Sequence, residues 1–318
     1  MLCKLKMNIL FYGYGNHAKR IKKYLDEYLT IPKSYCFIKK SIENINKVDS
    51  FNDISEAIKK FKEFSCVFIA SPNEYHLEHF KDCINFKIPY IYVEKPAIGI
   101  EEFLQKNSLN KSIKFLQIGY HYNYSPAIKK LKNIIEANSF GSLIRLDIFF
   151  GKGIAFKGNF LEGWRAQKHS QISETLGSHL LNIAIYLLGR ENIKYNKSII
   201  KKSVENNFHD TYHFSGFTKD SIMFSLTASW GSPLNQSIKA YFSNLIWSYD
   251  MKNISKKYPR DCFDEYGLFK APPETFENCE DPGINTSISS FIDKVLSGKD
   301  YIFELNNSGF TYELLSRN

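Results

Sequence analysis

Three stretches of this sequence carry residues that could do chemistry, and the first is a glycine-rich loop near the amino terminus. Gly13-Tyr-Gly15-Asn16-His-Ala18 lies between an apolar run and a helical pattern, and it matches G-x-G-x-x-G/A. There the first glycine permits a tight turn, the second lets the backbone approach a diphosphate, and the small third residue lets the helix pack closely. Glycine turns of this kind are common, so the prediction depends on the context. In that context Gly13, Gly15, Asn16 and Ala18 predict a dinucleotide site whose charge the helix N-terminus stabilises.

The residues after the second predicted strand bear on which dinucleotide is bound. An NAD site usually has an acidic residue about 20 positions after the glycine loop, where it binds the ribose hydroxyls. Here the strand Tyr35–Ile38 is followed by Lys39, Lys40 and Ser41, and no carboxylate is present. Two cations and a hydroxyl suit a 2′-phosphate, so the sequence favours NADP. The alternative, that both lysines are simply solvated, leaves NAD open.

The second stretch ends in a lysine directly after a predicted strand. It runs Phe68-Ile-Ala-Ser71-Pro72-Asn73-Glu-Tyr-His76, passes through a helical pattern, and closes with Ile91-Tyr-Val-Glu94-Lys95-Pro96. At the carboxyl end of a strand, beside the crevice where a dinucleotide binds, an ammonium group can polarise a carbonyl or stabilise an alkoxide. Lys95 is therefore the candidate catalytic residue. The alternative is a surface lysine at a strand end.

A polar stripe interrupts an otherwise apolar helix later in the chain. Thr175, His179, Asn182 and Tyr186 are spaced by four, three and four residues, which places them on one side of a helix. Polar side chains on a buried helix must face hydrogen-bonding partners or a cavity. A lone histidine is more often structural than catalytic, but the stripe makes His179 a second candidate for proton transfer.

These motifs, in this order, resemble those of the glucose-fructose oxidoreductase, inositol dehydrogenase and rhizopine-catabolism (Gfo/Idh/MocA) family. The resemblance depends first on the turn Ser71-Pro72-Asn73 and on the strand that ends in Glu94-Lys95-Pro96. It covers essentially the whole chain, continuing through Ile118-Gly-Tyr120, Ser125-Pro-Ala127, Trp164-Arg165, Leu176-Gly-Ser-His179 and Ala228-Ser-Trp230.

The resemblance implies a nicotinamide-dependent oxidoreductase acting on a sugar or cyclitol. It implies cofactor contacts along the second stretch, from Ser71, Pro72, Asn73, His76, Glu94 and Lys95, with Lys95 also catalytic. The substrate side would hold His121, Tyr122, Asn123, Trp164, Arg165, Thr175 and His179. The guanidinium of Arg165 could contact a cofactor or substrate phosphate through its fork of donors. The alternative for Trp164 is a core anchor.

The helix with the polar stripe departs from the family pattern. That pattern commonly reads D-x-x-x-H-x-x-D, whereas this chain has Thr175 and Asn182 in place of the two aspartates. Glu174 is adjacent, but in a regular helix a residue five positions before His179 points about 140° away from it. Proton transfer then falls to Lys95, His179 or both.

Some nucleotide-sugar enzymes of the family share this departure. We therefore predict hydride transfer between nicotinamide and a sugar carbon, at the alcohol/ketone level, on a nucleotide-activated or related sugar in glycan precursor synthesis. Two alternatives stay open. One is a cyclitol or free-sugar dehydrogenase, and the other is a catalytically degenerate dinucleotide-binding sensor or regulator of the same fold.

The elements that must position these residues fall into two patterns. Residues 8 to 119 alternate short, continuously apolar runs with amphipathic helical segments, which is typical of a parallel sheet covered on both faces. We predict a Rossmann domain over 1–120 and an α+β domain over 121–318 with a large, open, mainly antiparallel sheet for substrate binding and oligomerisation. Within the second domain, 258–281 is expected to be a loop and 284–296 a closing helix.

Composition narrows the classes of partner. The 318 residues carry 42 basic and 33 acidic side chains, a net charge of +9, but no block of five or more like charges. A nucleic-acid tail is therefore not expected, and no apolar run reaches the ~20 residues of a membrane span. The six cysteines form no C-x-x-C pair and no zinc-type cluster, so we expect free thiols, no metal and a cytoplasmic protein. A small anionic sugar substrate and a homo-oligomer, dimer or tetramer, remain the expected partners.

Overall fold

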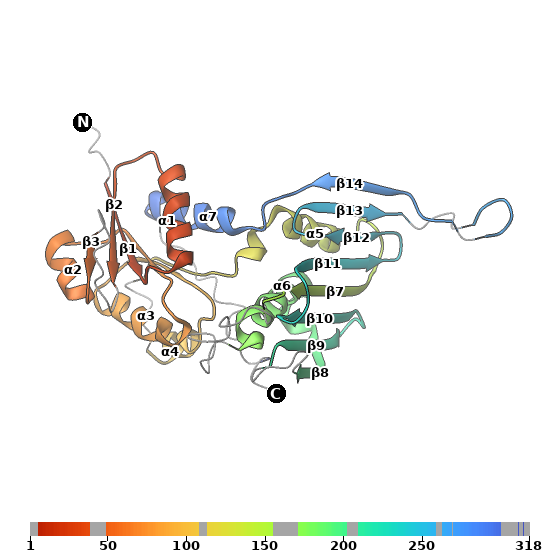
Figure 1. Ribbon diagram of the computed structural model, residues 1–318, viewed down its shortest axis with the longest axis horizontal. Coiled ribbons are helices and arrows are strands. Elements are labelled where there is room, and N and C mark those ends of the chain that lie inside the picture. Colours follow the sequence, from red (N-terminus) through yellow and green to blue (C-terminus); the bar gives the residue numbers. More distant parts are fainter. Residues whose placement is uncertain are drawn as a thin grey trace. The chain divides into compact units, whose positions relative to one another are not determined.

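The computed structural model describes residues 6–38, 49–107, 113–154, 171–201, 209–258, 263–268 and 270–299, together with Thr311 and Leu314. The chain divides into two compact units (Figure 1). The first is Met1–Tyr120 with Asn285–Gly309, and the second is His121–Ile284 with Phe310–Asn318. The first boundary between the two units falls after Tyr120. The segment Asn285–Gly309, however, belongs with the first unit, whereas the sequence prediction had assigned it to the second.

The first unit contains a six-stranded parallel sheet. The strands follow the order β3-β2-β1-β4-β5-β6, and their bounds are β1 (Met7–Tyr12), β2 (Lys33–Ile38), β3 (Asp49–Phe51), β4 (Cys66–Ile69), β5 (Tyr90–Val93) and β6 (Phe115–Ile118). Every residue of β4, β5 and β6 is buried, as expected when helices cover both faces. The order reverses between β1 and β4, which is the topological switch point where α/β sheets bind ligands. The predicted Rossmann-type sheet is confirmed.

Helices cover both faces of this sheet (Figure 1). On one face lie α1 (Asn16–Tyr28) and α7 (Ile284–Ser297), and on the other lie α2 (Ile54–Phe61), α3 (His76–Asn85) and α4 (Ile100–Asn107). Aromatic rings fill the space under α7: Phe291 meets Phe68 edge-on at 5.2 Å and Tyr92 at 5.6 Å between ring centroids. Such pairs add to the large apolar area that each ring buries, so α7 is part of the first unit's core.

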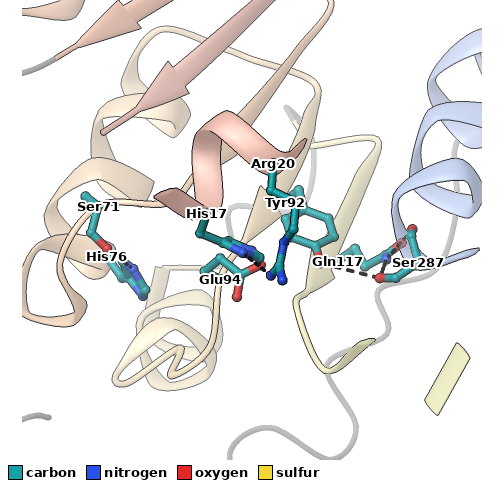
Figure 2. Close-up of polar contacts among 8 residues, drawn as sticks. All are labelled: His17, Arg20, Ser71, His76, Tyr92, Glu94, Gln117 and Ser287. Carbon is teal, nitrogen blue, oxygen red and sulfur yellow. Dashed lines mark hydrogen bonds and ion pairs between the residues drawn. The ribbon is translucent and has the colours of Figure 1, made fainter. Parts of the chain in front are cut away.

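A buried polar contact also fixes α7 on the sheet. The side-chain nitrogen of Gln117 in β6 donates to both the backbone oxygen and the hydroxyl of Ser287, each at 3.0 Å (Figure 2). Both residues are fully buried. Because a buried amide is costly unless it is hydrogen-bonded, this contact selects one position of α7 along β6. It explains why Asn285–Gly309 returns to the first unit.

The second unit contains an eight-stranded sheet in the order β14-β13-β12-β11-β7-β10-β9-β8. The bounds are β7 (Leu143–Gly151), β8 (Ile193–Lys201), β9 (Thr211–Thr218), β10 (Met223–Ser229), β11 (Asn235–Phe242), β12 (Ile246–Tyr249), β13 (Asn253–Lys257) and β14 (Glu274–Asn278). Only β7 and β10 pair in parallel. Helices α5 (Pro126–Glu136) and α6 (Ser178–Leu188) bury their apolar sides in the core of this unit. The predicted mainly antiparallel sheet is confirmed.

Three strands, β3, β13 and β14, were not expected from the sequence. β14 lies inside the stretch predicted to be a loop, and all five of its residues are exposed. An edge strand that buries no side chain needs no apolar alternation, so its sequence, Glu-Thr-Phe-Glu-Asn, gives no strand signal. β3 is only three residues long. In the part of the chain that the structure describes, no helix combines the length and apolar character needed to cross a membrane.

Candidate active site

The residues that follow the strands of the first unit line up at one edge of its sheet. Four backbone hydrogen bonds of 2.8 to 2.9 Å continue the pairing past the strand ends: Gly13 to Ile38, Ala70 to Tyr12, Glu94 to Ile69 and Gly119 to Val93, with the N–H donor named first. The glycine loop, the Ser71 turn and Lys95 therefore share the carboxyl edge of the sheet. This is the edge at which open α/β sheets bind ligands.

The glycine loop has the geometry that a diphosphate requires. Gly13 has φ +92°, and a Cβ there would lie 2.8 Å from the Ala70 carbonyl oxygen, so only glycine fits against β4. A Cβ on Gly15 would meet no atom of the described chain within 4 Å. Helix α1 starts at Asn16 with no acidic residue in its first turn. Ala18 is fully buried and packs the helix on the sheet. The open side of Gly15 and the helix N-terminus together fit an anion.

His76 contacts two of the turns at this edge of the sheet. It is buried, with Nδ1 2.9 Å from the Pro96 carbonyl oxygen and Nε2 2.9 Å from that of Ser71. The ring thus ties the turn after β4 to the turn after β5, and Figure 2 shows it beside Ser71. Both ring nitrogens face carbonyl oxygens of the protein, and the neutral ring donates to one of them. A contact between His76 and a cofactor stays a prediction. The neighbouring residue Asn73 starts a short 3-10 helix, Asn73–Tyr75, that follows Pro72.

This burial gives His76 a pH-dependent effect on stability. Burial lowers the pKa of His76 below its ordinary value of 6.5, against the opposing effects of the two carbonyls and Glu94. Because the unfolded chain then binds the proton first, the stabilisation is complete above about pH 6.5 and is lost as the pH falls below it.

Wild type and His76→Gln are therefore expected to diverge in acid. As the pH falls from about 7.5 to about 5.5, the free energy of unfolding of the wild type should drop more steeply than that of the variant. The difference should reach up to about 1.4 kcal/mol per pH unit. Denaturant unfolding at each pH measures this. Parallel curves for the two proteins would contradict the assignment.

Glu94 lies at the end of β5 and contacts two residues of α1. His17 Nε2 hydrogen-bonds one oxygen of the Glu94 carboxylate, and Arg20 Nη2 lies 2.6 Å from His17 Nδ1 (Figure 2). Because a guanidinium can only donate, Nδ1 is the acceptor and Nε2 carries the hydrogen that Glu94 accepts. His17 and Arg20 were not among the predicted site residues. Their spacing of three on one helix face was the available signal.

Lys95 follows Glu94 directly and is half-buried at the same edge. Its strand neighbour Tyr92 is fully buried, and its hydroxyl lies 3.4 Å from Ser287 Oγ. Burial, with the Glu94 charge as the next cause, raises the pKa of Tyr92 well above its ordinary value, so Tyr92 stays a neutral phenol. Tyr92 is therefore not the proton-exchanging group at this strand end, and Lys95 stays the candidate for that role.

In the second unit, the predicted stripe on α6 faces a short 3-10 helix, His121–Tyr124. Asn123 Nδ2 donates to Asn182 Oδ1 at 2.7 Å. The His179 ring lies 5.0 Å from the rings of both His121 and Tyr122, tilted at 68° and 89°. His179 and Asn182 are both buried. The structure thus brings the predicted residues His121, Tyr122, Asn123 and His179 into one cluster, the α6 cluster.

The start of this helix differs from the expected regular α-helix. Ser173–Gly177 forms a π-helical turn, and α6 begins only at Ser178. Thr175 lies in the π turn, where its hydroxyl donates to the Gln171 carbonyl at 2.8 Å. A π turn holds more residues than an α turn, so Glu174 is rotated toward the side of His179 relative to a regular helix. The separation of about 140° for a regular helix therefore does not apply between Glu174 and His179.

Several predicted residues fall outside the described part of the chain. These are Lys39, Lys40 and Ser41 of the proposed 2′-phosphate contact, and Trp164 and Arg165 of the proposed substrate side. β2 ends at Ile38, immediately before the first three, and the carbonyl of Ile38 accepts from Gly13 N–H.

The fold and the glycine loop define the class: a Rossmann-type dinucleotide-binding unit combined with an α+β unit that carries a large open sheet. No protein-family profile matches the chain. One curated protein, glucose-6-phosphate 3-dehydrogenase from Bacillus subtilis (strain 168), is 29% identical over 154 residues, 46% of this chain. The aligned segment spans only 40% of that enzyme's length.

Solved structures match over nearly the whole chain. A putative NADPH-dependent oxidoreductase from Desulfitobacterium hafniense DCB-2 has a TM-score of 0.79 at 15% identity, covering 98% of this chain and 94% of its own. Myo-inositol 2-dehydrogenase from Lactobacillus plantarum has 0.77 at 13%, covering 98% and 95%. GenD2 from gentamicin A biosynthesis, in complex with NAD, has 0.76 at 13%, covering 98% and 92%. The chain has the fold of the Gfo/Idh/MocA oxidoreductases, and the resemblance predicted from the motifs is confirmed in that fold.

Proposed function

We propose that this protein is an NAD(P)-dependent oxidoreductase that interconverts an alcohol and a ketone on a sugar carbon. The observation that carries the proposal is the shared edge of the first unit's sheet, where the glycine loop follows β1 and Lys95 lies just beyond β5. A bound nicotinamide supplies the hydride acceptor or donor. Similar proteins are named glucose-6-phosphate 3-dehydrogenase, myo-inositol 2-dehydrogenase and levoglucosan dehydrogenase, which supports the same class of reaction.

The residues present fit such a cofactor. Backbone N–H groups at Gly15 and Asn16, on the open side of the loop, hold the diphosphate. Ser71, Pro72 and Asn73 lie along the cofactor in this assignment, and Lys39, Lys40 and Ser41 hold a 2′-phosphate, so NADP is the proposed cofactor. One similar structure is named NADPH-dependent, while GenD2 and levoglucosan dehydrogenase were solved with NAD and NADH.

The protein's own groups handle the hydroxyl proton. Lys95 stabilises the developing alkoxide with its ammonium group and exchanges the proton with the hydroxyl oxygen. His179 shares the proton transfer, and Asn123, held by Asn182, keeps the polar side of the α6 cluster oriented. Trp164, Arg165 and Thr175 complete the substrate side of the proposal.

The proposed substrate is an anionic sugar. A nucleotide-activated sugar, in the synthesis of glycan precursors, is the first candidate, and the named activity of the Bacillus subtilis relative adds sugar phosphates. The net charge of +9 is consistent with either anion. A neutral cyclitol or free sugar is the second candidate.

A dinucleotide-binding sensor of the same fold is the competing function. The observation that favours it is the replacement of both helix carboxylates of the family pattern, by Thr175 and Asn182. We also propose a cytoplasmic homo-oligomer that forms through the open sheet. On the face of that sheet away from its helices, Phe217 and Met223 pair across β9 and β10 while 42% and 49% exposed.

The test begins with fluorescence titration of the purified protein with NADPH and NADH. Absorbance of the reduced cofactor is then followed with nucleotide sugars, sugar phosphates, cyclitols and free sugars. Binding with turnover on a sugar supports the proposal, and tighter binding of NADPH supports the 2′-phosphate assignment. Binding without turnover on any member of the panel indicates the sensor, and binding of neither dinucleotide refutes both.

A further inference from the structure

Three residues from two segments form a polar bridge, the His17 bridge, which consists of Arg20, His17 and Glu94. His17 and Arg20 lie on α1, in and just after the glycine loop, while Glu94 lies 77 positions from His17, at the end of β5. The three groups of the bridge are, in order, a guanidinium, an imidazole and a carboxylate. Each hydrogen bond has one possible direction, from Arg20 to Nδ1 and from Nε2 to Glu94.

Low exposure and the neighbouring Gly119 favour the orientation of the Glu94 carboxylate toward His17. The Glu94 side chain is only 13% exposed, so its charge is costly unless a donor meets it. Across the sheet edge lies Gly119, where an added Cβ would stand 2.9 to 3.0 Å from all three carboxylate atoms. The absence of a side chain at Gly119 thus leaves the room that the carboxylate occupies.

The bridge joins the two parts of the proposed site. One end is built on α1, whose first turn holds the diphosphate, and the other end is the residue directly before Lys95. A shift of about 1 Å in a reacting group can cost on the order of 100-fold in rate. Contacts that fix the backbone at Glu94 relative to the glycine loop therefore also fix the backbone position of Lys95.

We propose that His17 is a positioning residue, which with Arg20 holds Glu94 and so places Lys95 for catalysis. The inference builds on the proposed function, because it deepens the assignment of Lys95. It predicts a specific pattern among variants. Loss of His17's donor or displacement of Glu94 lowers kcat, whereas an amide, which can accept from Arg20 and donate to Glu94, preserves it.

Four variants test this, each assayed with the substrate that the panel identifies. His17→Leu removes the bridge, and Gly119→Ala pushes the flexible end of Glu94 aside while leaving the backbone intact. Both are expected to lower kcat by about 10- to 100-fold, with KM for the cofactor changed by less than about threefold. His17→Gln should stay within about threefold of wild type in kcat. Lys23→Met, which alters an exposed residue of the same helix, is the control and should match wild type.

A second measurement needs no activity. In the cofactor-free protein, 15N-histidine NMR should show His17 as the Nε2–H tautomer, and Arg20→Met and Gly119→Ala should both disturb that signal while Lys23→Met does not. A wild type that turns over no sugar refutes the proposed function, and the NMR still decides on the bridge.

The inference is overturned if His17→Leu keeps wild-type kcat, or if His17→Gln is as impaired as His17→Leu. It is also overturned if His17 in the wild type is protonated on Nδ1 alone. Melting temperatures of all variants separate a general loss of stability from misplacement of Lys95. Only misplacement lowers kcat in a variant whose melting temperature equals that of the wild type.

Discussion

Lys95→Ala is expected to lower kcat by about 10²- to 10⁴-fold, the range over which a positioned general acid or base contributes. Lys95 lies just past β5 at the sheet edge that carries the glycine loop, and it is half-buried there. Lys95 directly follows Glu94, whose carboxylate accepts the hydrogen bond of the His17 bridge. Without the Lys95 ammonium group, the alkoxide that forms on hydride transfer has lost both its counter-charge and its proton donor. Steady-state kinetics on the identified sugar measure the effect.

Lys95→Arg separates the two parts of that role. Arginine retains the positive charge, but its pKa is too high for it to give up a proton near neutral pH. If proton exchange is the larger part, Lys95→Arg should remain within about tenfold of Lys95→Ala. Lys59→Ala, an exposed lysine of α2, controls for the loss of a charge elsewhere in the first unit. Near-normal turnover by Lys95→Ala would remove Lys95 from the catalytic role.

The parts of the fold that the sequence predicts are those where burial dictates residue type. Strands β4 and β5 are buried on both faces, so each is a continuous apolar run, Cys66–Ile69 and Tyr90–Val93. The exposed edge strand β14 obeys no such constraint, and its five residues read as a loop. α7 was predicted as a helix, but its unit was not. Its placement depends on Gln117 and Ser287, which are 170 positions apart, and no local pattern reports such a contact.

The residues of the candidate site likewise divide into those that the sequence reveals and those that only the fold reveals. The glycine spacing follows from backbone geometry, so Gly13 and Gly15 are visible in the sequence. His76 also stands out there, but only the fold reveals that its two nitrogens lie 2.9 Å from the Ser71 and Pro96 carbonyl oxygens. The π turn at Ser173–Gly177 has no sequence signal comparable to a cap or a proline, which is why a regular helix was expected around Glu174. Local rules identify residue types, and tertiary contacts decide what those residues touch.

Gly15→Val is expected to abolish dinucleotide binding while leaving the fold intact. Gly15 has an ordinary φ of −72°, and a Cβ there would meet no atom of the described chain within 4 Å, so we expect the substitution to be tolerated. That open space is where a diphosphate would approach the first turn of α1. We expect NADPH affinity to fall by at least about 100-fold, which corresponds to roughly 2.7 kcal/mol. Fluorescence titration gives the affinity, and a melting temperature close to that of wild type checks the fold.

Gly13→Ala provides the matched comparison, because it is the same kind of change two residues earlier with the opposite expected outcome. At φ +92° an alanine costs about 1–2 kcal/mol, and its Cβ would press on the Ala70 carbonyl besides. This variant should therefore melt several degrees below wild type even without cofactor. If Gly15→Val bound NADPH as tightly as wild type, the diphosphate would not lie on this loop. If Gly13→Ala kept full stability, the close approach of the loop to β4 would not be a requirement of the fold.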